Sequence, residues 1–297
     1  MSATALASTP ALTAPLRRRH RPGSAEPRGV IFRLDDVVLP TRALYFRAWS
    51  EALGAALEGF RHGEMASSYF MREPDFDSNR SARPLTEQEY ESAIFERDPR
   101  AAAIDLLRLR GVSVHSDPLL EQVIDPQQTV LGIILAMDEA VKAQIAIDNP
   151  IDPELLHLMG DLHSEGFQLA VTTPSEHALT LAKRSFDVYF FTDEIVSAKG
   201  PKTETTPAED PLLIPASNQL RIVPERLVVF ESTPSGILAA NAGGFARAVG
   251  IAPTDEGRER LRRAGADELR SSAGEVTADE VIRWVEEGRG GRQLRTN

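Results

Sequence analysis

Short apolar runs rich in β-branched residues alternate along this chain with segments in which apolar residues recur every three or four positions. The first pattern is typical of buried strands and the second of amphipathic helices. Their alternation predicts an α/β fold, in which helices cover both faces of a parallel sheet. The strands are expected at residues 29–34, 167–173, 227–231 and 246–251.

Two of the expected helices have residues typical of helix boundaries at both ends. Asp152 precedes Pro153, which suits the first position of a helix, and Gly166 follows the last apolar position. A second helix opens near Ser235 and ends at Gly243. Each of these helices leads directly into an expected strand, as the units of a parallel sheet do.

The stretch from residue 41 to about residue 115 lacks clear strand patterns and is predicted to be helical. It separates the first two strands of the sheet, so we expect it to cover the carboxyl edge, where open α/β folds bind ligands. The predicted domains are a flexible basic tail (1–27), an α/β core (28–42 and 116–287), a helical cap (43–115) and a flexible C-terminal tail (288–297).

Charge and residue usage narrow the class of partner. The 297 residues include 33 Lys and Arg against 44 Asp and Glu, so the net charge is −11. We therefore expect neither nucleic acid nor a membrane as a partner. The first 25 residues contain no Asp or Glu and cannot build a core. A transit peptide or an anion-binding arm is the alternative to a plain tail.

The chain has no Cys, which fits a reducing cytoplasm. Its longest apolar run, 130–137, is too short to cross a bilayer. The six His residues show no spacing typical of metal ligands. We expect a cytoplasmic protein without a His-based metal site.

Several short segments share a pattern with a known family. They are VIFRLDDVVL at 30–39, LAVTTPS at 169–175, LVVFE at 227–231 and GILAANAGGF at 236–245. In order and spacing they resemble the motifs of the haloacid dehalogenase (HAD)-like superfamily, in its β-phosphoglucomutase-like and trehalose-associated phosphatase branch. The resemblance runs from about residue 28 to 287. It implies a Rossmann-like core with an inserted α-helical cap.

The resemblance also implies a chemistry. An Asp at the end of the first strand would be the nucleophile that forms an aspartyl-phosphate, and a second Asp two residues later the general acid and base. Mg²⁺ would be held by the nucleophile, by the backbone carbonyl of the second Asp and by an acid after the fourth motif's strand. A Thr or Ser and a Lys would hold the phosphate.

This chain departs from that pattern at the reactive positions. The nucleophile position is Arg33, the acid/base position keeps Asp35, and the Gly that normally follows is Asp36. After the fourth motif's strand, Glu231 is followed by Ser232 where the family has a second acid. Both side-chain ligands of Mg²⁺ are therefore missing, and we expect no metal and no other cofactor.

The phosphate-binding positions are kept only in part. Thr173 is retained, either to hold phosphate or simply to cap the next helix. The family's Lys aligns with Thr206, although Lys199 and Lys202 are near enough in sequence to replace it, Lys202 being the phosphate-binding candidate. Tyr45 stands where the family's cap has a sugar-gating His.

A buried arginine needs a partner, so we expect Arg33 to pair with Asp35 or Glu231 and replace the metal ion. Binding of an anion by Arg33 is the alternative. The leading hypothesis is a catalytically degenerate HAD-like protein that senses a ligand, such as a sugar phosphate, or binds a protein. A third hypothesis is a structural module whose cap interface binds another protein and whose pocket is collapsed. The alternative is an active, Mg²⁺-dependent sugar-phosphate phosphatase or phosphoglucomutase of unconventional mechanism.

Overall fold

The computed structural model describes residues 26–63, 69–74, 76–77, 79, 82–94, 97–115, 123–145, 151–175, 178–180, 182, 186–197 and 212–288. Nearly all of the two predicted tails therefore lies outside the described residues. Among the helices described, none combines the length and the apolar character that crossing a bilayer requires.

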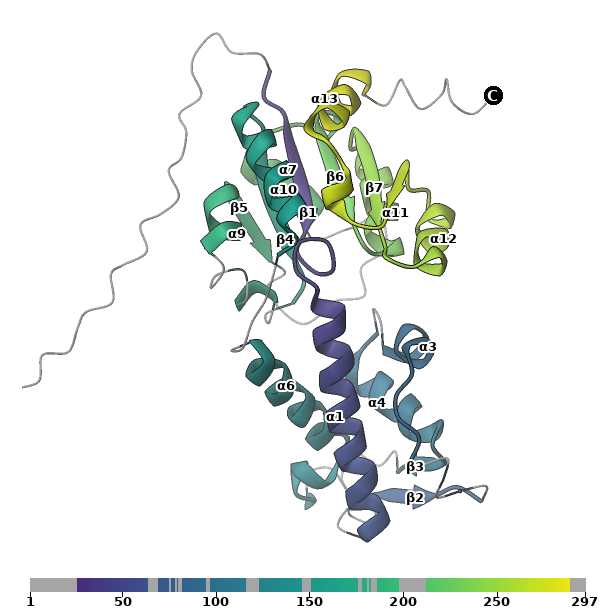
Figure 1. Ribbon diagram of the computed structural model, residues 1–297. Helices are drawn as coiled ribbons and strands as arrows, with labels where there is room; N and C mark the ends of the chain where they lie inside the picture. Colours follow the sequence, from purple (N-terminus) through teal and green to yellow (C-terminus); the bar gives the residue numbers. More distant parts are fainter. Residues whose placement is uncertain are drawn as a thin grey trace, which may run out of the picture.

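Within the described residues, a sheet of six strands forms the core, in the spatial order β5-β4-β1-β6-β7-β8, and every neighbouring pair is parallel (Figure 1). The predicted α/β fold and its four predicted strands are confirmed. The sequence prediction lacks β5 and β8, the two edge strands, which are short and only partly buried. The strands are β1 (Gly29–Arg33), β4 (Gln168–Thr173), β5 (Glu194–Ser197), β6 (Leu227–Glu231), β7 (Arg247–Ile251) and β8 (Glu268–Arg270).

Helices cover both faces of this sheet because side chains alternate along each strand. Val30 and Phe32 of β1 are buried in one hydrophobic cluster with residues of α7 and α13. Ile31 lies in a second cluster with residues of α10, α11 and α12. The helices of the core are α7 (Pro153–Ser164), α9 (Phe186–Phe191), α10 (Leu213–Leu220), α11 (Pro234–Gly243), α12 (Asp255–Arg263) and α13 (Ala278–Glu287), with 3₁₀ turns η3 (Pro224–Arg226) and η4 (Ala273–Glu275).

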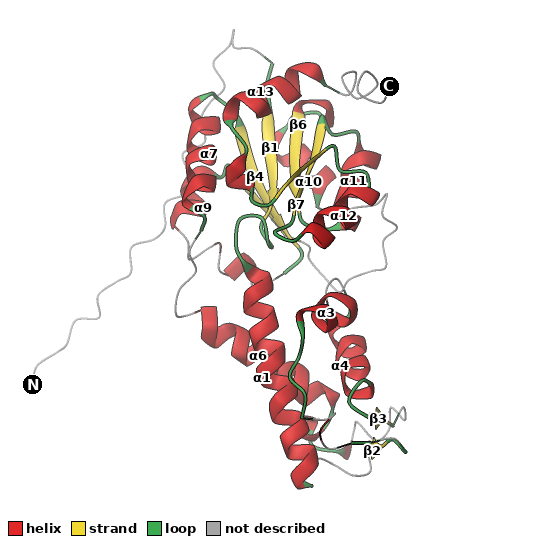
Figure 2. Ribbon diagram, turned by 45° about the vertical axis from the view of Figure 1, so that its right-hand side comes forward, coloured by secondary structure: helices red, strands yellow, loops and turns green. Residues whose placement is uncertain are grey.

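A second body, here called the helical unit, lies beyond the carboxyl edge of the sheet (Figure 2). It also contains a two-stranded antiparallel ribbon, β2 with β3, where the sequence indicated helices alone. Its elements are α1 (Thr41–His62), β2 (Phe70–Arg72), α3 (Glu87–Glu89), a π-helical turn η1 (Tyr90–Ile94), α4 (Pro99–Arg108), β3 (Val112–Val114), a 3₁₀ turn η2 (Pro126–Gln128) and α6 (Val130–Ile145).

The helical unit extends further along the chain than predicted. Helix α6, which the sequence prediction assigned to the core, packs alongside α1. Ile133, Met137 and Val141 of α6 are buried in the cluster that also contains Trp49 and Leu53 of α1. The predicted cap boundary at 115 is therefore wrong, because the apolar face of α6 is compatible with either body and only packing selects one.

Residues 34–40 form the turn that leads from β1 into α1. The backbone N–H of Leu39 donates to the carbonyl of Leu34 at 2.9 Å, and Asp35 forms a bridge with Leu39. This tight connection places the residues that follow β1 at the junction between the core and the helical unit.

Candidate functional site

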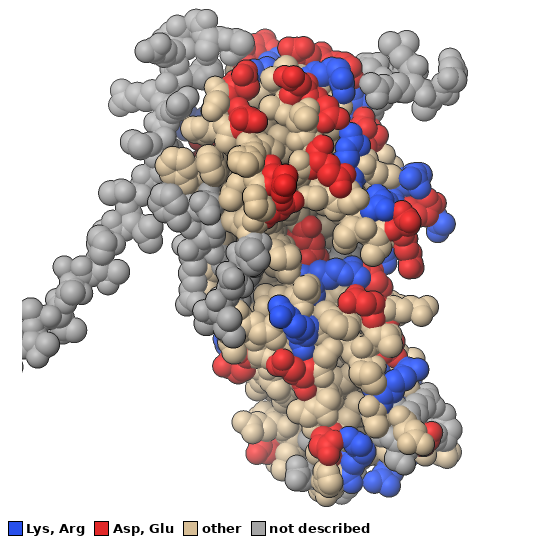
Figure 3. Space-filling view, in the orientation of Figure 1, with Lys and Arg blue, Asp and Glu red and all other residues tan. Residues whose placement is uncertain are grey.

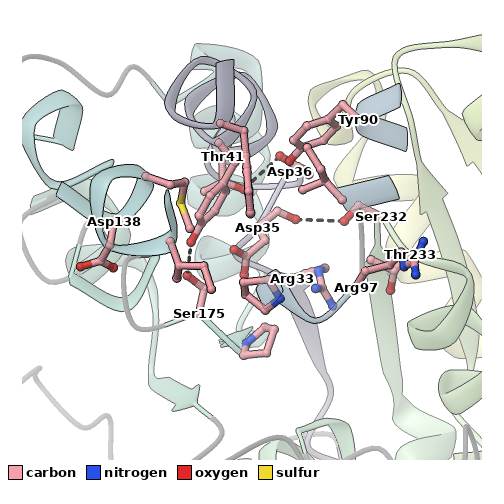
Figure 4. A pocket seen from close by; sticks show the side chains of 17 residues that line it. Arg33, Asp35, Asp36, Thr41, Tyr90, Arg97, Asp138, Ser175, Ser232 and Thr233 are labelled. Carbon is pink, nitrogen blue, oxygen red and sulfur yellow. Dashed lines mark hydrogen bonds between the residues drawn. The ribbon is translucent and has the colours of Figure 1, made fainter. Parts of the chain in front are cut away.

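A cavity of about 390 Å³ lies between the core and the helical unit (Figure 4). The loops after β1, β4 and β6 form one wall, and α1, η1, α4 and α6 contribute to the other. In Figure 3, acidic and basic side chains lie side by side along this junction. The lining residues are Arg33, Asp35, Asp36, Thr41, Tyr45, Trp49, Tyr90, Ile94, Arg97, Pro99, Ile134, Met137, Asp138, Pro174, Ser175, Ser232 and Thr233.

Arg33, the residue at the expected nucleophile position, forms an ion pair with Glu231. The distance from Arg33 Nη1 to Glu231 Oε1 is 3.6 Å, and the two side chains are 15% and 2% exposed. The two residues meet because β1 and β6 are neighbours in the sheet. The predicted pairing of Arg33 with Glu231 is confirmed.

Glu231 is also held by the beginning of α11. Its Oε2 accepts hydrogen bonds from the backbone N–H of Ser232 and the hydroxyl of Thr233, both at 3.1 Å. The carboxylate lies so close to α11 that a Cβ added at Gly236 would overlap it. A negative charge is favourable near the N-terminus of a helix. The carboxylate therefore has fixed partners on two sides, and Arg33 is one of them.

Asp35 is contacted from two neighbouring strands. The hydroxyl of Ser232 donates to its backbone carbonyl at 3.0 Å, and the hydroxyl of Thr173 donates to its Oδ2 at 2.5 Å. Thr173 Oγ1 also accepts the backbone N–H of Ser175 at 2.9 Å, as in a local turn. Thr173 therefore supports both the turn after β4 and the Asp35 carboxylate.

Asp36 occupies the family's Gly position with a φ of 63°, in the left-handed region that Asp tolerates better than most residues. Its Oδ1 accepts the backbone N–H of Arg42 at 2.5 Å and the hydroxyl of Thr41 at 3.0 Å. Burial raises the pKa of Asp36 to about 6, although the hydrogen bond from Arg42 opposes this rise. Asp36 thus caps α1, a role that the sequence analysis missed because the cap lies five residues before the helix.

Tyr45 connects the helical unit with the core. Its hydroxyl and that of Ser175 are 2.7 Å apart and share a hydrogen bond. Burial raises the pKa of Tyr45, so its phenol is neutral at physiological pH. Tyr45, at the expected sugar-gating position, therefore forms a hydrogen bond with the core at the edge of the cavity.

The structure brings together seven of the residues singled out from the sequence. They are Arg33, Asp35, Asp36, Tyr45, Thr173, Glu231 and Ser232. The other three, Lys199, Lys202 and Thr206, lie outside the described residues.

The sequence analysis missed most of the wall formed by the helical unit. Tyr90 and Arg97 line the cavity, as does Asp138 of α6. No local motif marks these residues, since they meet the core only through the fold.

The residues present do not fit the magnesium site that the resemblance implies. Its two carboxylate positions are Arg33 and Ser232, and the third ligand, the carbonyl of Asp35, already accepts a hydrogen bond from Ser232. A guanidinium brings positive charge to the place of the cation and offers no ligand atom. Within the described residues there is also no group of three or more His, Cys, Asp or Glu that could hold a metal ion.

Curated proteins similar to this chain are phosphatases. A phosphorylated carbohydrates phosphatase of Thermotoga maritima is 24% identical over 267 residues, which cover 87% of this chain and 98% of that protein. A trehalose-phosphate phosphatase of Mycobacterium avium is 37% identical over 78 residues, or 26% of this chain and 19% of that protein. The second match thus concerns only a small part of the relative. No family model matches the chain.

Solved structures agree in fold over most of the chain. A HAD hydrolase of family IA, variant 3, from Entamoeba histolytica has a TM-score of 0.60 at 16% identity, covering 87% of this chain and 99% of that one. An archaeal β-phosphoglucomutase from Pyrococcus sp. strain ST 04 has a TM-score of 0.58 at 18% identity, covering 88% and 99%. Curated relatives and solved structures point to the same group, and this chain has the fold of the HAD-like phosphatases and phosphoglucomutases.

Proposed function

We propose that this chain is a catalytically degenerate HAD-like protein that binds a small ligand in the cavity between its core and its helical unit. The proposal rests on the contacts that residues at the expected catalytic positions make with one another. Arg33 pairs with Glu231, and Ser232 donates to the carbonyl of Asp35. A divalent cation and a phosphorylated carboxylate would need these same positions.

The loss of a nucleophile supports this proposal on chemical grounds. A guanidinium cannot form an acyl phosphate, and losing a nucleophile typically lowers the rate by about 10⁴-fold or more. Arg33 also stands where the family has a metal ligand. The nucleophile and the metal ligand would therefore both be missing from the phosphoryl-transfer step. Phosphoryl transfer by the family's route is therefore not expected.

The cavity supports a role in ligand binding. Its volume of about 390 Å³ lies within the range of small-molecule pockets. Aromatic side chains of Trp49, Tyr45 and Tyr90 line it together with charged and hydroxyl groups. The described residues form a cavity, which does not support the hypothesis of a module with a collapsed pocket. Because similar proteins are named as phosphatases of phosphorylated carbohydrates and of trehalose phosphate, such compounds are the first candidates as ligands.

An active phosphatase is the second candidate. In its favour, Asp35 keeps the acid/base position and its carboxylate retains a hydrogen bond from Thr173. Such an enzyme would have to use Asp35 without the usual nucleophile. The two candidates differ in whether phosphate is released.

A phosphate-release assay with Mg²⁺ and a panel of sugar phosphates separates them. We expect no release above background from the parent protein and saturable binding of at least one sugar phosphate by calorimetry. The matched control is the double variant Arg33→Asp/Ser232→Asp, which restores both carboxylates. Turnover by the parent that disappears in Asp35→Asn would overturn the proposal in favour of the enzyme.

A further inference from the structure

Glu91 of the helical unit lies between two arginines from different parts of the chain. Its carboxylate contacts the guanidinium of Arg42, at the start of α1, and that of Arg260, on α12 of the core. The side chains of Glu91, Arg42 and Arg260 are 14%, 25% and 34% exposed. Partly buried ion pairs are screened by salt less than pairs on the open surface. This cluster is therefore a candidate for a lasting contact between the two bodies.

The backbone at Glu91 is unusual. Residues Tyr90–Ile94 form one π-helical turn, a rare conformation that often marks functional sites. Tyr90 and Ile94 of this turn line the large cavity, whereas Glu91 contacts the arginines. The contact that fixes Glu91 thus also fixes this part of the cavity wall.

Arg42 joins this cluster to the turn between the two bodies. Its backbone N–H donates to Asp36, within the connection 34–40, while its side chain contacts Glu91. Asp36 and Ser232 line the large cavity, and both also line a smaller one that Arg42 and Arg260 border. The charged cluster is therefore adjacent to the site rather than remote from it.

We propose that Arg42, Glu91 and Arg260 form an ionic latch, which holds the helical unit against the core and keeps the cavity between them narrow. When Glu91 separates from Arg260, the helical unit can rotate about the connection 34–40. Tyr90 and Ile94 then move away from the core, and solvent gains wider access to the cavity and to Trp49 in its wall. The latch acts whether or not the cavity binds a ligand, so it is independent of the proposed function.

The absence of Cys allows spin labels to be placed at will. Arg108→Cys on α4 and Glu256→Cys on α12 are exposed positions on the two bodies. Double electron–electron resonance on this pair should give one dominant distance in the parent. Glu91→Gln and Arg260→Gln should each increase a longer-distance population about tenfold, the effect of losing one partly buried ion pair. Because the two residues act together, the double variant should resemble either single variant.

Arg262→Gln is the matched control, because the ion pair of Arg262 is with Glu259 on the same helix. It should leave the distances unchanged. Acrylamide quenching gives a second readout, since Trp49 lines the cavity and is 2% exposed. Quenching should rise in Glu91→Gln, and the rise should vanish in Glu91→Gln/Trp49→Phe. Unchanged distances in both Glu91→Gln and Arg260→Gln, or a change in Glu91→Gln alone, would overturn the latch.

Discussion

The hydroxyl of Ser232 donates a 3.0 Å hydrogen bond to the backbone carbonyl of Asp35. The two residues follow β6 and β1, which are neighbouring strands of the sheet. The resemblance to the HAD-like superfamily implies a divalent cation between these two positions. In this structure a direct hydrogen bond between the loops occupies the carbonyl that would bind the ion.

This arrangement predicts that the protein does not bind Mg²⁺ at millimolar concentration. The positions of both carboxylate ligands hold Arg33 and Ser232, so the donor set lacks the charge that a hard cation needs. Isothermal titration calorimetry should show no saturable heat. Arg33→Asp/Ser232→Asp should bind Mg²⁺ in that range. A saturable site in the parent, abolished by Asp35→Asn, would contradict the prediction.

Arg33→Ala is expected to destabilise the fold by roughly 3–5 kcal/mol, because it leaves the buried carboxylate of Glu231 without its cation. The free energy of unfolding from urea denaturation measures the effect. The control is Arg33→Ala/Glu231→Gln, which removes both charges and should recover a large part of the loss. If Arg33→Ala unfolds like the parent, the guanidinium does not compensate Glu231.

Asp36 predicts a dependence of stability on pH. Its pKa is raised from 3.8 to about 6, so the folded protein holds this proton more tightly than the unfolded chain does. The favourable contribution of the protonated group is therefore present below about pH 4 and is lost as the pH rises to about 6. Asp36→Asn, which tolerates the same backbone conformation, should remove this decline and gain at most about 3 kcal/mol at pH 7.

The control for this pH dependence is Asp152→Asn. A hydrogen bond from Ser272 lowers the pKa of Asp152, so this carboxylate stabilises the fold above its ordinary pKa and loses the effect as the pH falls. Asp152→Asn should therefore lower stability at neutral pH, opposite to Asp36→Asn. Urea titrations between pH 4 and pH 7 measure both variants. Parallel pH profiles for Asp36→Asn and the parent would show that Asp36 titrates normally.

Two glycines in helices should respond in opposite directions to alanine. A Cβ at Gly236 would overlap the Glu231 carboxylate, so Gly236→Ala should cost about 1–3 kcal/mol. Gly54, within α1, has no atom within 4 Å of an added Cβ, and Gly54→Ala should stabilise by about 0.5–1 kcal/mol. Thermal denaturation of the two variants compares them directly. If Gly236→Ala leaves the stability unchanged, the Glu231 side chain can move away from α11 without loss of stability.

Local patterns in the sequence were sufficient for the inner strands of the sheet. The runs that became β1, β4, β6 and β7 are apolar on both faces, because neighbouring strands and helices surround them. The position of Arg33 at the end of such a run also predicted a partner among the acids nearby. A buried charge needs an oppositely charged partner, whether that partner lies near in the sequence or far from it.

The tertiary structure alone decided which distant groups meet. The face of α6 could have packed on either body, and its place beside α1 brings Asp138 into the cavity wall. Likewise, no spacing along the chain relates Ser232 to the carbonyl of Asp35, or Glu91 to Arg260. The sequence by itself determined the inner strands and placed Arg33 and Ser232 where the family it resembles has carboxylates, since both depend on residue type and near neighbours. The cavity and its contacts depend on how the core and the helical unit pack against each other, which no local pattern encodes.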